Sequence, residues 1–352
     1  MRNGQRACIL VLSVANIVSF SVYGNAHAEG RPLPNAELER LANLKENDID
    51  IGTTAFVLAS EAFPDLDIQR YSAQLDRLAG EIRQFTETMR PRTTDSTKPD
   101  YPIRAMNTYF YKRQGFHYDR DDMYALQLKN RYLNGTLDAK AGSCTTLPLL
   151  YLALAQRLGY PVYPVAAPQH LFCRYRLPDG TYQNIEATAG GWSPDADYIS
   201  QLEIPEAGIK SGAYLETMTY RQLLGDLIAE NGGYWARQKE FARAVRYMTI
   251  ALRLNPKSAE VWRMLGYASH QLADEYAQMD ARLPQLQNPT LLFTKGLYRT
   301  YSQDYRRESH RAFERAMELG VAPPAQANYW VRQRELAKAV QQHPTSQWEG
   351  AP

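Results

Sequence analysis

Residues 142–191 read GSCTTLPLLYLALAQRLGYPVYPVAAPQHLFCRYRLPDGTYQNIEATAGG. Three chemically useful side chains follow one another in this stretch, namely Cys144, His170 and Glu186. A thiol, an imidazole and a carboxylate are the groups of a nucleophile, its general base and the residue that orients the base. The stretch therefore predicts a thiol site, provided that the fold brings the three side chains together.

The first part of this stretch predicts a buried helix. Ser143 is a favourable N-cap residue, the apolar run after it reaches Leu158, and Gly159 suits the C-cap. Cys144 is expected in the first turn of this helix. Free N–H groups and the helix dipole at that end favour a thiolate and can stabilise an oxyanion.

The second part predicts a β-hairpin. Strands 169–177 and 181–188 flank Pro178-Asp179-Gly180, which is a turn sequence. If the loop has three residues and ends in the left-handed region, His170 and Glu186 lie on the same face of the sheet. A two-residue loop would invert the parity, so the predicted site depends on this register.

Three motifs give the chain a resemblance to the transglutaminase-like superfamily. They are Gly142-Ser143-Cys144, Leu158-Gly159-Tyr160-Pro161-Val162 and Asn184-Ile185-Glu186-Ala187-Thr188. The resemblance implies a papain-like arrangement with Cys144 as nucleophile, His170 as base and Glu186 as the acid that orients it. The acid in this superfamily is usually Asp, so the Glu here keeps the charge and adds a methylene.

The resemblance extends to a bacterial branch that joins a transglutaminase-like domain to tetratricopeptide repeats. The matching positions are Asn130 to Asn134, Leu137, Gly142, Leu147, Tyr151, Arg157 to Gly159, Pro168 to Leu171, and Gly190-Gly191. Many members of that branch have Pro where Cys144 stands here and are taken to lack thiol chemistry. Cys144 therefore favours an active site in this chain.

Further groups are candidates for oxyanion binding or for support of the site. They are the Cys144 backbone N–H and the side chains of Asn130, Asn134 and Gln169. For the two asparagines the alternative is ordinary helix-end and turn chemistry. That alternative is favoured over direct catalysis, with a structural role for Asn130.

Composition narrows the classes of function. The 352 residues carry a formal net charge of +2, which gives no electrostatic case for binding nucleic acid or a membrane surface. Six scattered histidines do not form a metal-binding pattern, and phosphate-binding loops, HExxH and CxxC are absent from the sequence. No cofactor or metal is expected.

Residues 1–28 resemble a secretory signal peptide. Arg2 and Arg6 precede the apolar run 7–22, and Ala26-His27-Ala28 is a small-residue cleavage site. The alternative, an N-terminal membrane anchor, is disfavoured because the run is short. We expect a periplasmic or secreted bacterial protein with no membrane-spanning segment after cleavage.

Of the three cysteines, Cys8 lies in this leader, which leaves Cys144 and Cys173. An exported chain with two cysteines invites a disulfide. Strand parity argues against it, since Cys173 is expected to face away from His170. Cys173 is predicted to be a small buried hydrophobic residue.

The C-terminal part shows repeat spacing. The small, aromatic, small, bulky, small and breaker positions of a tetratricopeptide unit are occupied, in this order, by Gly232, Trp235, Ala244, Met248, Ala251 and Pro256. Trp262, Leu265 and Gly266 open the next unit. A later helical pair, roughly 291–305 and 308–319, predicts a degenerate third repeat, and 329–341 a capping helix. A plain helical bundle is the alternative.

The sequence thus predicts an α+β papain/transglutaminase-like domain followed by an all-α tetratricopeptide-like domain. The expected boundaries are 1–28 for the leader, 29–205 and 206–345 for the two domains, and 346–352 for the tail. The expected function is amide-bond chemistry, as a protease, amidase or transglutaminase, with the repeats binding a protein or peptide. The alternative is a catalytically inactive fold that serves as a peptide-binding scaffold.

Overall fold

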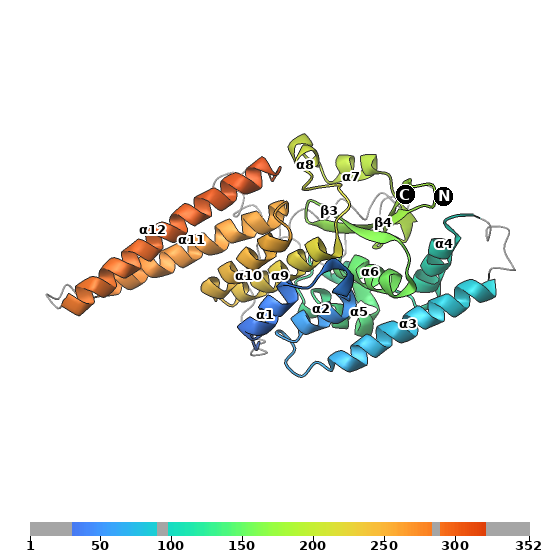
Figure 1. Cartoon of the computed structure of the whole chain (residues 1–352), viewed down its shortest axis with the longest axis horizontal. Helices are drawn as coiled ribbons and strands as arrows, with labels where there is room; N and C mark the ends of the chain where they lie inside the picture. Colours follow the sequence, from blue (N-terminus) through green and yellow to red (C-terminus); the bar gives the residue numbers. More distant parts are fainter. Residues whose placement is uncertain (1–29, 90–97, 284–288, 322–352) are drawn as a thin grey trace.

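The structure is a computed structural model that describes residues 30–89, 98–283 and 289–321. Figure 1 shows a sheet with surrounding helices, from which a long helical hairpin, orange to red, projects to the left. The predicted leader, the capping helix at 329–341 and the tail at 346–352 lie outside the described residues.

The first lobe consists of helices and a small sheet packed around one central helix, α6 (Thr146–Leu158). Its helices are α1 (Asn35–Ala42), η2 (Glu46–Asp48), α2 (Ile51–Ala59), α3 (Ile68–Met89), α4 (Tyr101–Asn107), the π-helix η5 (Thr108–Arg113), η6 (Arg120–Asp122), η7 (Leu128–Asn130), α5 (Leu133–Ala139), α6 (Thr146–Leu158), α7 (Asp195–Gln201) and α8 (Glu206–Lys210). Its strands are β1 (His117–Tyr118), β2 (Ala141–Gly142), β3 (Val162–Ala167), β4 (His170–Arg176), β5 (Tyr182–Glu186) and β6 (Gly191–Trp192).

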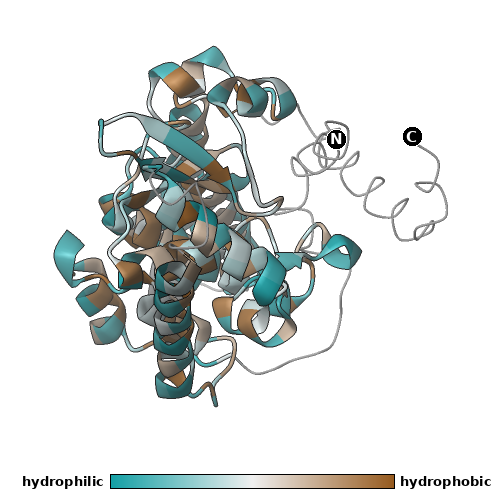
Figure 2. Cartoon of the chain, turned by 90° about the vertical axis from the view of Figure 1, so that its right-hand side faces the viewer, coloured by the Kyte–Doolittle hydropathy of each residue, from teal (hydrophilic) through white to brown (hydrophobic). Residues whose placement is uncertain are grey.

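Helix α6 is the centre of this lobe. Its residues from Thr146 to Ala155 are all buried, because α2, α3 and α5 pack on it from one side and β3 and β4 from the other. A helix that is apolar all round belongs in a core. In Figure 2 hydrophobic segments lie where helices and sheet meet, and the outer ends of the elements are mostly hydrophilic.

The predicted start of α6 needs a correction. The helix begins at Thr146, so Cys144 lies in the turn before it and not in its first turn. Ser143 Oγ accepts hydrogen bonds from the N–H groups of Thr145 and Thr146, both at 3.2 Å, and so satisfies helix-end donors as a cap does. The predicted end is confirmed, since Gly159 is left-handed with φ 71°.

Gly142, which ends β2, is required by close packing. A Cβ at this position would stand 2.7 Å from the side-chain oxygens of both Thr136 and Thr146. These two hydroxyls are hydrogen bonded to each other, and Thr146 Oγ1 also accepts from the Ser143 N–H. The glycine therefore lets the turn that carries Cys144 lie directly against the start of α6.

The main sheet is an antiparallel meander in the order β3-β4-β5-β6. The predicted hairpin register is confirmed: Arg176 pairs with Tyr182 and Cys173 with Ile185, across a three-residue loop that ends at left-handed Gly180, φ 86°. A second, two-stranded parallel pairing joins β1 to β2.

The C-terminal region consists of α9 (Tyr220–Arg237), α10 (Phe241–Leu254), α11 (Ala259–Arg282) and α12 (Pro289–Glu318). Consecutive helices pack on one another as two hairpins. Glycines lie where these helices come close: a Cβ at Gly232 would meet Tyr247 at 3.1 Å, and one at Gly266 would meet Phe313 at 2.9 Å. Gly232 and Gly266, which the repeat spacing singled out, therefore lie at contacts between neighbouring helices.

The predicted helical pair at 291–305 and 308–319 is wrong. Both segments belong to the single helix α12, which packs on α11. No Gly or Pro interrupts the sequence between them, and one buried stripe continues through the supposed break. The stripe consists of Ser302, Ser309, Ala312, Ala316 and Leu319. The region described here therefore has two hairpins and no third helical pair at these residues.

A buried carboxylate joins the two lobes. Glu61, after α2, is fully buried and accepts hydrogen bonds from the Leu33 N–H, the Asn231 amide, the Trp235 indole and the Tyr247 hydroxyl. The last three side chains lie on α9 and α10. Because a buried charge is tolerated only when it is hydrogen bonded, this cluster fixes α2 against the C-terminal helices. We call it the Glu61 site.

Both described cysteines are free, so no disulfide joins Cys144 and Cys173. Cys173 is fully buried, as expected, and its thiol donates to the Pro148 carbonyl at 3.6 Å. None of the helices in the described ranges is long and apolar enough to cross a bilayer.

Candidate active site

The hairpin brings His170 and Glu186 together. His170 begins β4 and Glu186 ends β5, and the confirmed register places them on one face. His170 Nε2 lies 2.8 Å from Glu186 Oε2, and the side chains are 0% and 1% exposed. The carboxylate therefore fixes the orientation of the imidazole.

Glu186 has hydrogen bonds on both carboxylate oxygens. Thr188 donates its N–H to Oε1 at 3.0 Å and its hydroxyl to the same oxygen at 2.5 Å. Tyr198 donates its hydroxyl to Oε2 at 3.0 Å and stacks on Phe172 with ring centroids 4.0 Å apart. We call Glu186 with these partners and His170 the Glu186 site.

Tyr198 is a site residue that the sequence reasoning missed. It lies on α7, which no motif connected to the sheet, and its partner is set by how α7 packs on the strands. The only hint in the sequence was a tyrosine 12 residues after Glu186. Because the chain has 24 tyrosines, this hint does not single out Tyr198.

Electrostatics favour a charged pair at His170 and Glu186. Burial lowers the pKa of His170, but the Glu186 charge and hydrogen bonds outweigh burial and raise that pKa to about 10. Burial raises the pKa of Glu186, and the His170 charge with the Thr188 hydrogen bonds lowers it overall. Near neutral pH the pair is therefore an imidazolium and a carboxylate.

The other ring nitrogen of His170 is turned to the thiol side. Within the described residues, Nδ1 is buried and has no partner with hydrogen-bond geometry. The Cys144 thiol is nonetheless close enough to raise the His170 pKa through hydrogen bonding and charge. Cys144 itself is 8% exposed, so the reactive atoms are largely shielded from water.

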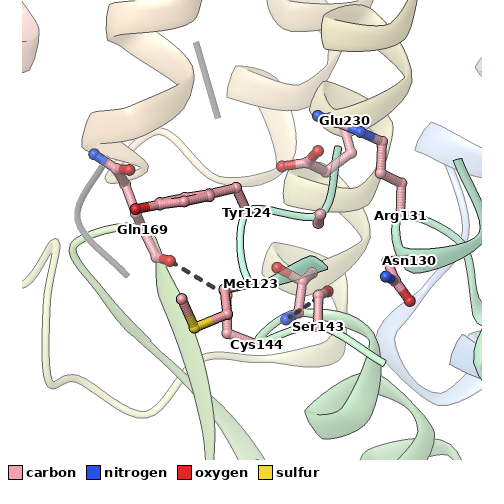
Figure 3. A pocket seen from close by; sticks show the side chains of 10 residues that line it. Met123, Tyr124, Asn130, Arg131, Ser143, Cys144, Gln169 and Glu230 are labelled. Carbon is pink, nitrogen blue, oxygen red and sulfur yellow. Dashed lines mark hydrogen bonds between the residues drawn. The ribbon is translucent and has the colours of Figure 1, made fainter. Parts of the chain in front are cut away.

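Gln169 positions the backbone opposite the thiol. Gln169 is the second residue of the two-residue turn Pro168-Gln169 between β3 and β4, and its φ is 52°. Pro at the first turn position and a positive φ at the second are the features of a type II turn. Its carbonyl accepts from Cys144 Sγ at 3.6 Å, marked by the dashed line in Figure 3. A positive φ at a non-glycine residue is uncommon, and it here occurs beside the proposed nucleophile.

The two predicted asparagines differ in place. Asn130 is fully buried, and its Nδ2 donates to Asp119 at 2.9 Å and to Asp122 at 2.7 Å, so this amide is not available as an oxyanion donor in this arrangement. Asp122 also accepts from the Leu126 and Gln127 N–H groups. Asn130 thus holds the segment that passes over Cys144.

Asn134 lies in α5, is buried, and does not line either of the cavities described next. The Cys144 N–H, in contrast, has no acceptor within the described part of the chain. Among the predicted oxyanion donors, the Cys144 N–H therefore remains free, and Gln169 lines both cavities. The catalytic and supporting roles of these residues stay predictions.

Two cavities adjoin each other, with volumes of about 430 and 860 Å³ when their solvent-open mouths are included, and the first of them is lined by Cys144. The first is lined by Met123, Tyr124, Ala125, Asn130, Arg131, Ser143, Cys144, Thr145, Gln169 and Glu230. Figure 3 shows it with Cys144 and Gln169 on one side and Arg131 and Glu230 on the other. Thr145, Gln169 and Glu230 also line the second cavity, which contains His170.

The second cavity lies between the lobes. One wall comes from the β3–β4 hairpin and the other from α9, α11 and the residues joining α10 to α11. The cleft thus combines the predicted thiol site with side chains of the helical region. Sequence reasoning placed the helices in a separate domain and did not foresee that they border the site.

His117, a histidine outside this cleft, is exposed, and its ring donates a hydrogen bond to the Gly115 carbonyl at 2.9 Å. Within the described ranges, no group of three or more His, Cys, Asp and Glu side chains is placed to hold a metal ion.

Comparison with known proteins agrees with this architecture. A family model described as the transglutaminase-like superfamily matches residues 69–228, a range that contains Cys144, His170 and Glu186 and ends within α9. No solved structure matches the chain significantly.

The relatives include proteins of bacteria and of animals. A UPF0162 protein of Xylella fastidiosa (strain Temecula1) is 25% identical over 238 residues, which cover 66% of this chain and 81% of the relative. A UPF0162 protein of Pasteurella multocida is 25% identical over 244 residues, 65% of this chain and 88% of the relative. Human F-box only protein 21 is 34% identical over 73 residues, 21% of this chain and 11% of that protein. Residues 69–228 therefore form a transglutaminase-like domain by similarity, and a helical C-terminal region follows it.

Proposed function

We propose that this protein is a thiol-dependent enzyme that acts on amide bonds of a polypeptide. The observation that carries the proposal is the position of His170. One ring nitrogen is 2.8 Å from the buried Glu186 carboxylate, and the other is unpartnered beside Cys144 in a cleft. A base held between an orienting acid and a thiol is the arrangement that activates a cysteine nucleophile.

The first half of the reaction forms a thioester. The Cys144 thiolate attacks the carbonyl carbon of a carboxamide or peptide bond, and the resulting oxyanion accepts a hydrogen bond from the Cys144 N–H. The C–N bond then breaks, and the His170 imidazolium gives its proton to the departing amine or ammonia. Glu186 keeps the ring in place and stabilises its charged form, which agrees with the raised pKa of His170.

The second half releases the acyl group. His170, now neutral, takes a proton from water or from an amine, which attacks the thioester carbon. The C–S bond breaks, and the thiolate and imidazolium are restored. Water as acceptor gives a protease or amidase, and an amine gives a transglutaminase; the residues on the cleft walls are compatible with both outcomes.

The proposal includes a role for the helices and a place of action. We expect the C-terminal helices to act as tetratricopeptide-like repeats that hold a protein partner or substrate, since such arrays present extended binding surfaces. The sequence of residues 1–28 supports export to the periplasm or beyond.

One observation favours a second candidate, a non-catalytic binding fold. Cys144 donates to the Gln169 carbonyl and is nearly buried, a state in which the thiol serves as a packed donor. In that case the cleft would bind a peptide without cleaving it.

Alkylation of Cys144 by iodoacetamide separates the two. The rate on the folded full-length chain is measured from pH 5 to 9, with peptide mapping to isolate Cys144 from the other cysteines. We expect rapid alkylation at pH 6 that is lost in His170→Ala, because the imidazolium holds the thiolate. A thiol that reacts no faster at pH 6 than a free cysteine, with or without His170, contradicts the enzyme and supports the binding fold.

A further inference from the structure

The cavity that Cys144 lines has an arginine in its opposite wall. Arg131 directly follows η7 and is one of the lining residues. Figure 3 shows its side chain across the cavity from Cys144 and Gln169. A molecule that fills this cavity can therefore reach the thiol with one end and the guanidinium with the other.

The guanidinium of Arg131 has hydrogen-bonding capacity that the protein does not use. A guanidinium carries five N–H donors. Its Nη2 is buried and has no hydrogen-bond partner within the described residues. In the same ranges Arg131 also forms no ion pair. Because a buried donor without a partner is costly, this nitrogen is suited to a ligand that supplies an acceptor.

The surroundings of Arg131 do not compensate for its burial. Burial lowers the pKa of Arg131, and the charges of Glu230, Tyr132 and Asp122 raise that pKa by less. Arg237 is a second arginine nearby, and burial together with the Arg131 charge lowers the pKa of Arg237 to about 9. Both guanidiniums are thus less stable as cations than in water, and an added negative charge would stabilise them.

The carboxylates near Arg131 are not placed to pair with it. Asp122 already accepts hydrogen bonds from two backbone N–H groups, at 2.8 and 2.9 Å, and from the Asn130 amide at 2.7 Å. Glu230 interacts with the charge of Arg131 and of Arg237, but forms an ion pair with neither in the part of the chain that the structure describes. This end of the cavity therefore has room for a further acid.

We infer that the wall opposite Cys144 is a subsite for a carboxylate of a polypeptide substrate, either the chain-terminal carboxylate or an acidic side chain. The carboxylate accepts charge-assisted hydrogen bonds from the Arg131 guanidinium, whose planar fork matches it. Arg131 is then a specificity residue, since it lies across the cavity from the thiol and takes no part in the bond changes. The inference rests on the proposed function and names the group that stands near the bond under attack.

The test uses pairs of alkylating reagents that differ only in a carboxylate or a carboxamide. N-iodoacetylglycine and N-iodoacetylglycinamide represent a chain terminus. The α-amides of N-iodoacetylaspartate and N-iodoacetylasparagine represent a side chain. In each reaction the Cys144 sulfur forms an S–C bond as the C–I bond breaks and iodide leaves. Rates are measured on the full-length chain at pH 7, with peptide mapping for Cys144, and each is divided by the rate of free cysteine with the same reagent.

We expect the carboxylate reagent of one pair to exceed its carboxamide partner by about tenfold after this correction. Arg131→Gln should bring the ratio near one. Arg131→Lys keeps the charge without the fork and should retain a ratio of about three, which covers the case in which the neutral variant folds poorly. Arg307→Gln, at an exposed residue on α12, is the control for loss of one positive charge and should leave the ratio unchanged. Melting curves confirm folding.

The pair with the larger ratio identifies the source of the carboxylate. Ratios near one for both pairs overturn the subsite, as does a ratio that is the same in the wild type and in Arg131→Gln. An equal decrease in Arg307→Gln also overturns it, because the preference would then come from the general field of the protein.

The carboxamide reagents report on the proposed function separately. If their rates do not depend on His170 while the ratio still depends on Arg131, the enzyme proposal fails and the carboxylate subsite stands. If their rates fall in His170→Ala and the ratio does not depend on Arg131, only the subsite fails.

Discussion

Glu61 and Glu186 are two fully buried glutamates with different surroundings. Both accept hydrogen bonds on each carboxylate oxygen. The donors at Glu61 are a backbone amide, an amide side chain, an indole and a hydroxyl, all uncharged, and they belong to two lobes. Glu186 has a histidine among its donors, beside a thiol and a cleft. The two carboxylates are therefore suited to different tasks. Glu61 joins two lobes through uncharged donors, whereas Glu186 orients a histidine that can transfer a proton.

The largest expected difference between the two sites is in pH dependence. The folded pKa of His170 is raised from 6.5 to about 10, so its contribution is complete below pH 6.5 and is lost as pH rises toward 10. The slope approaches about 1.4 kcal/mol per pH unit for one proton. Unfolding by urea across this range should show the loss in the wild type and not in His170→Asn. Parallel curves for the two proteins would show that the pair is not charged.

Below pH 4.5 the stability contributed by the pair depends on pH in the opposite direction. The pKa of Glu186 is lowered from 4.5, so its contribution is present above pH 4.5 and is lost as pH falls below it. The pair therefore contributes most between about pH 4.5 and 6.5. At the Glu61 site the donors carry no charge, so the wild type and Glu61→Gln should differ by a constant amount between pH 6.5 and 10.

The next largest effect is expected from Glu61→Gln itself. The new NH₂ group faces donors, so the free energy of unfolding should fall by about 3 kcal/mol. Cys144 alkylation of the protein that remains folded should not change. Chemical denaturation gives the first quantity and peptide mapping the second. A loss of thiol reactivity equal to that of a Glu186 variant would remove the distinction between the two sites.

Glu186→Gln should have the converse effect on reactivity. Removing the negative charge lowers the proton affinity of His170, so alkylation of Cys144 at pH 6 should fall about tenfold or more. The rate at pH 9, where a free thiol already ionises, should change less. Equal rates at pH 6 in the variant and the wild type would show that Glu186 has no part in thiol activation.

The smallest effect is expected from Tyr198→Phe. The ring still stacks on Phe172, and Glu186 loses one of its hydrogen bonds, which is a loss of about 1 kcal/mol. Alkylation at pH 6 should decrease about threefold to fivefold. Phe172→Leu is the matched variant that disturbs the stacking and keeps the hydroxyl. If it has the larger effect on the rate, Tyr198 acts through packing and not through its hydroxyl.

The parts of the site that follow from short-range rules were predictable from the sequence. Gly180 allowed a three-residue loop, and the parity of two strands then placed His170 and Glu186 on one face. The end of α6 at Gly159 followed from the same left-handed preference. These features depend on residues near one another in the chain, whose conformational preferences the sequence states directly.

The parts that depend on how elements pack were not predictable. Tyr198 reaches Glu186 only because α7 covers one end of the sheet, and Asp226 faces the cleft only because α9 docks against the β3–β4 hairpin. The predicted break within α12 was based on repeat spacing alone. Residues 305–308 contain no Gly or Pro that would end a helix, and the helix continues through them. In each case the deciding contacts lie between surfaces that no local pattern specifies.

The Glu61 site also has a consequence for the order in which the chain becomes stable during synthesis. Its side-chain donors Asn231, Trp235 and Tyr247 follow it by 170, 174 and 186 residues, whereas His170 and Tyr198 lie within 16 and 12 residues of Glu186. A nascent chain that has just completed the hairpin and α7 already holds every partner of Glu186. The same chain has a glutamate at position 61 whose partners in the C-terminal helices do not yet exist. The Glu61 cluster can therefore form only after α9 and α10 have been made, whereas the Glu186 cluster can form before them.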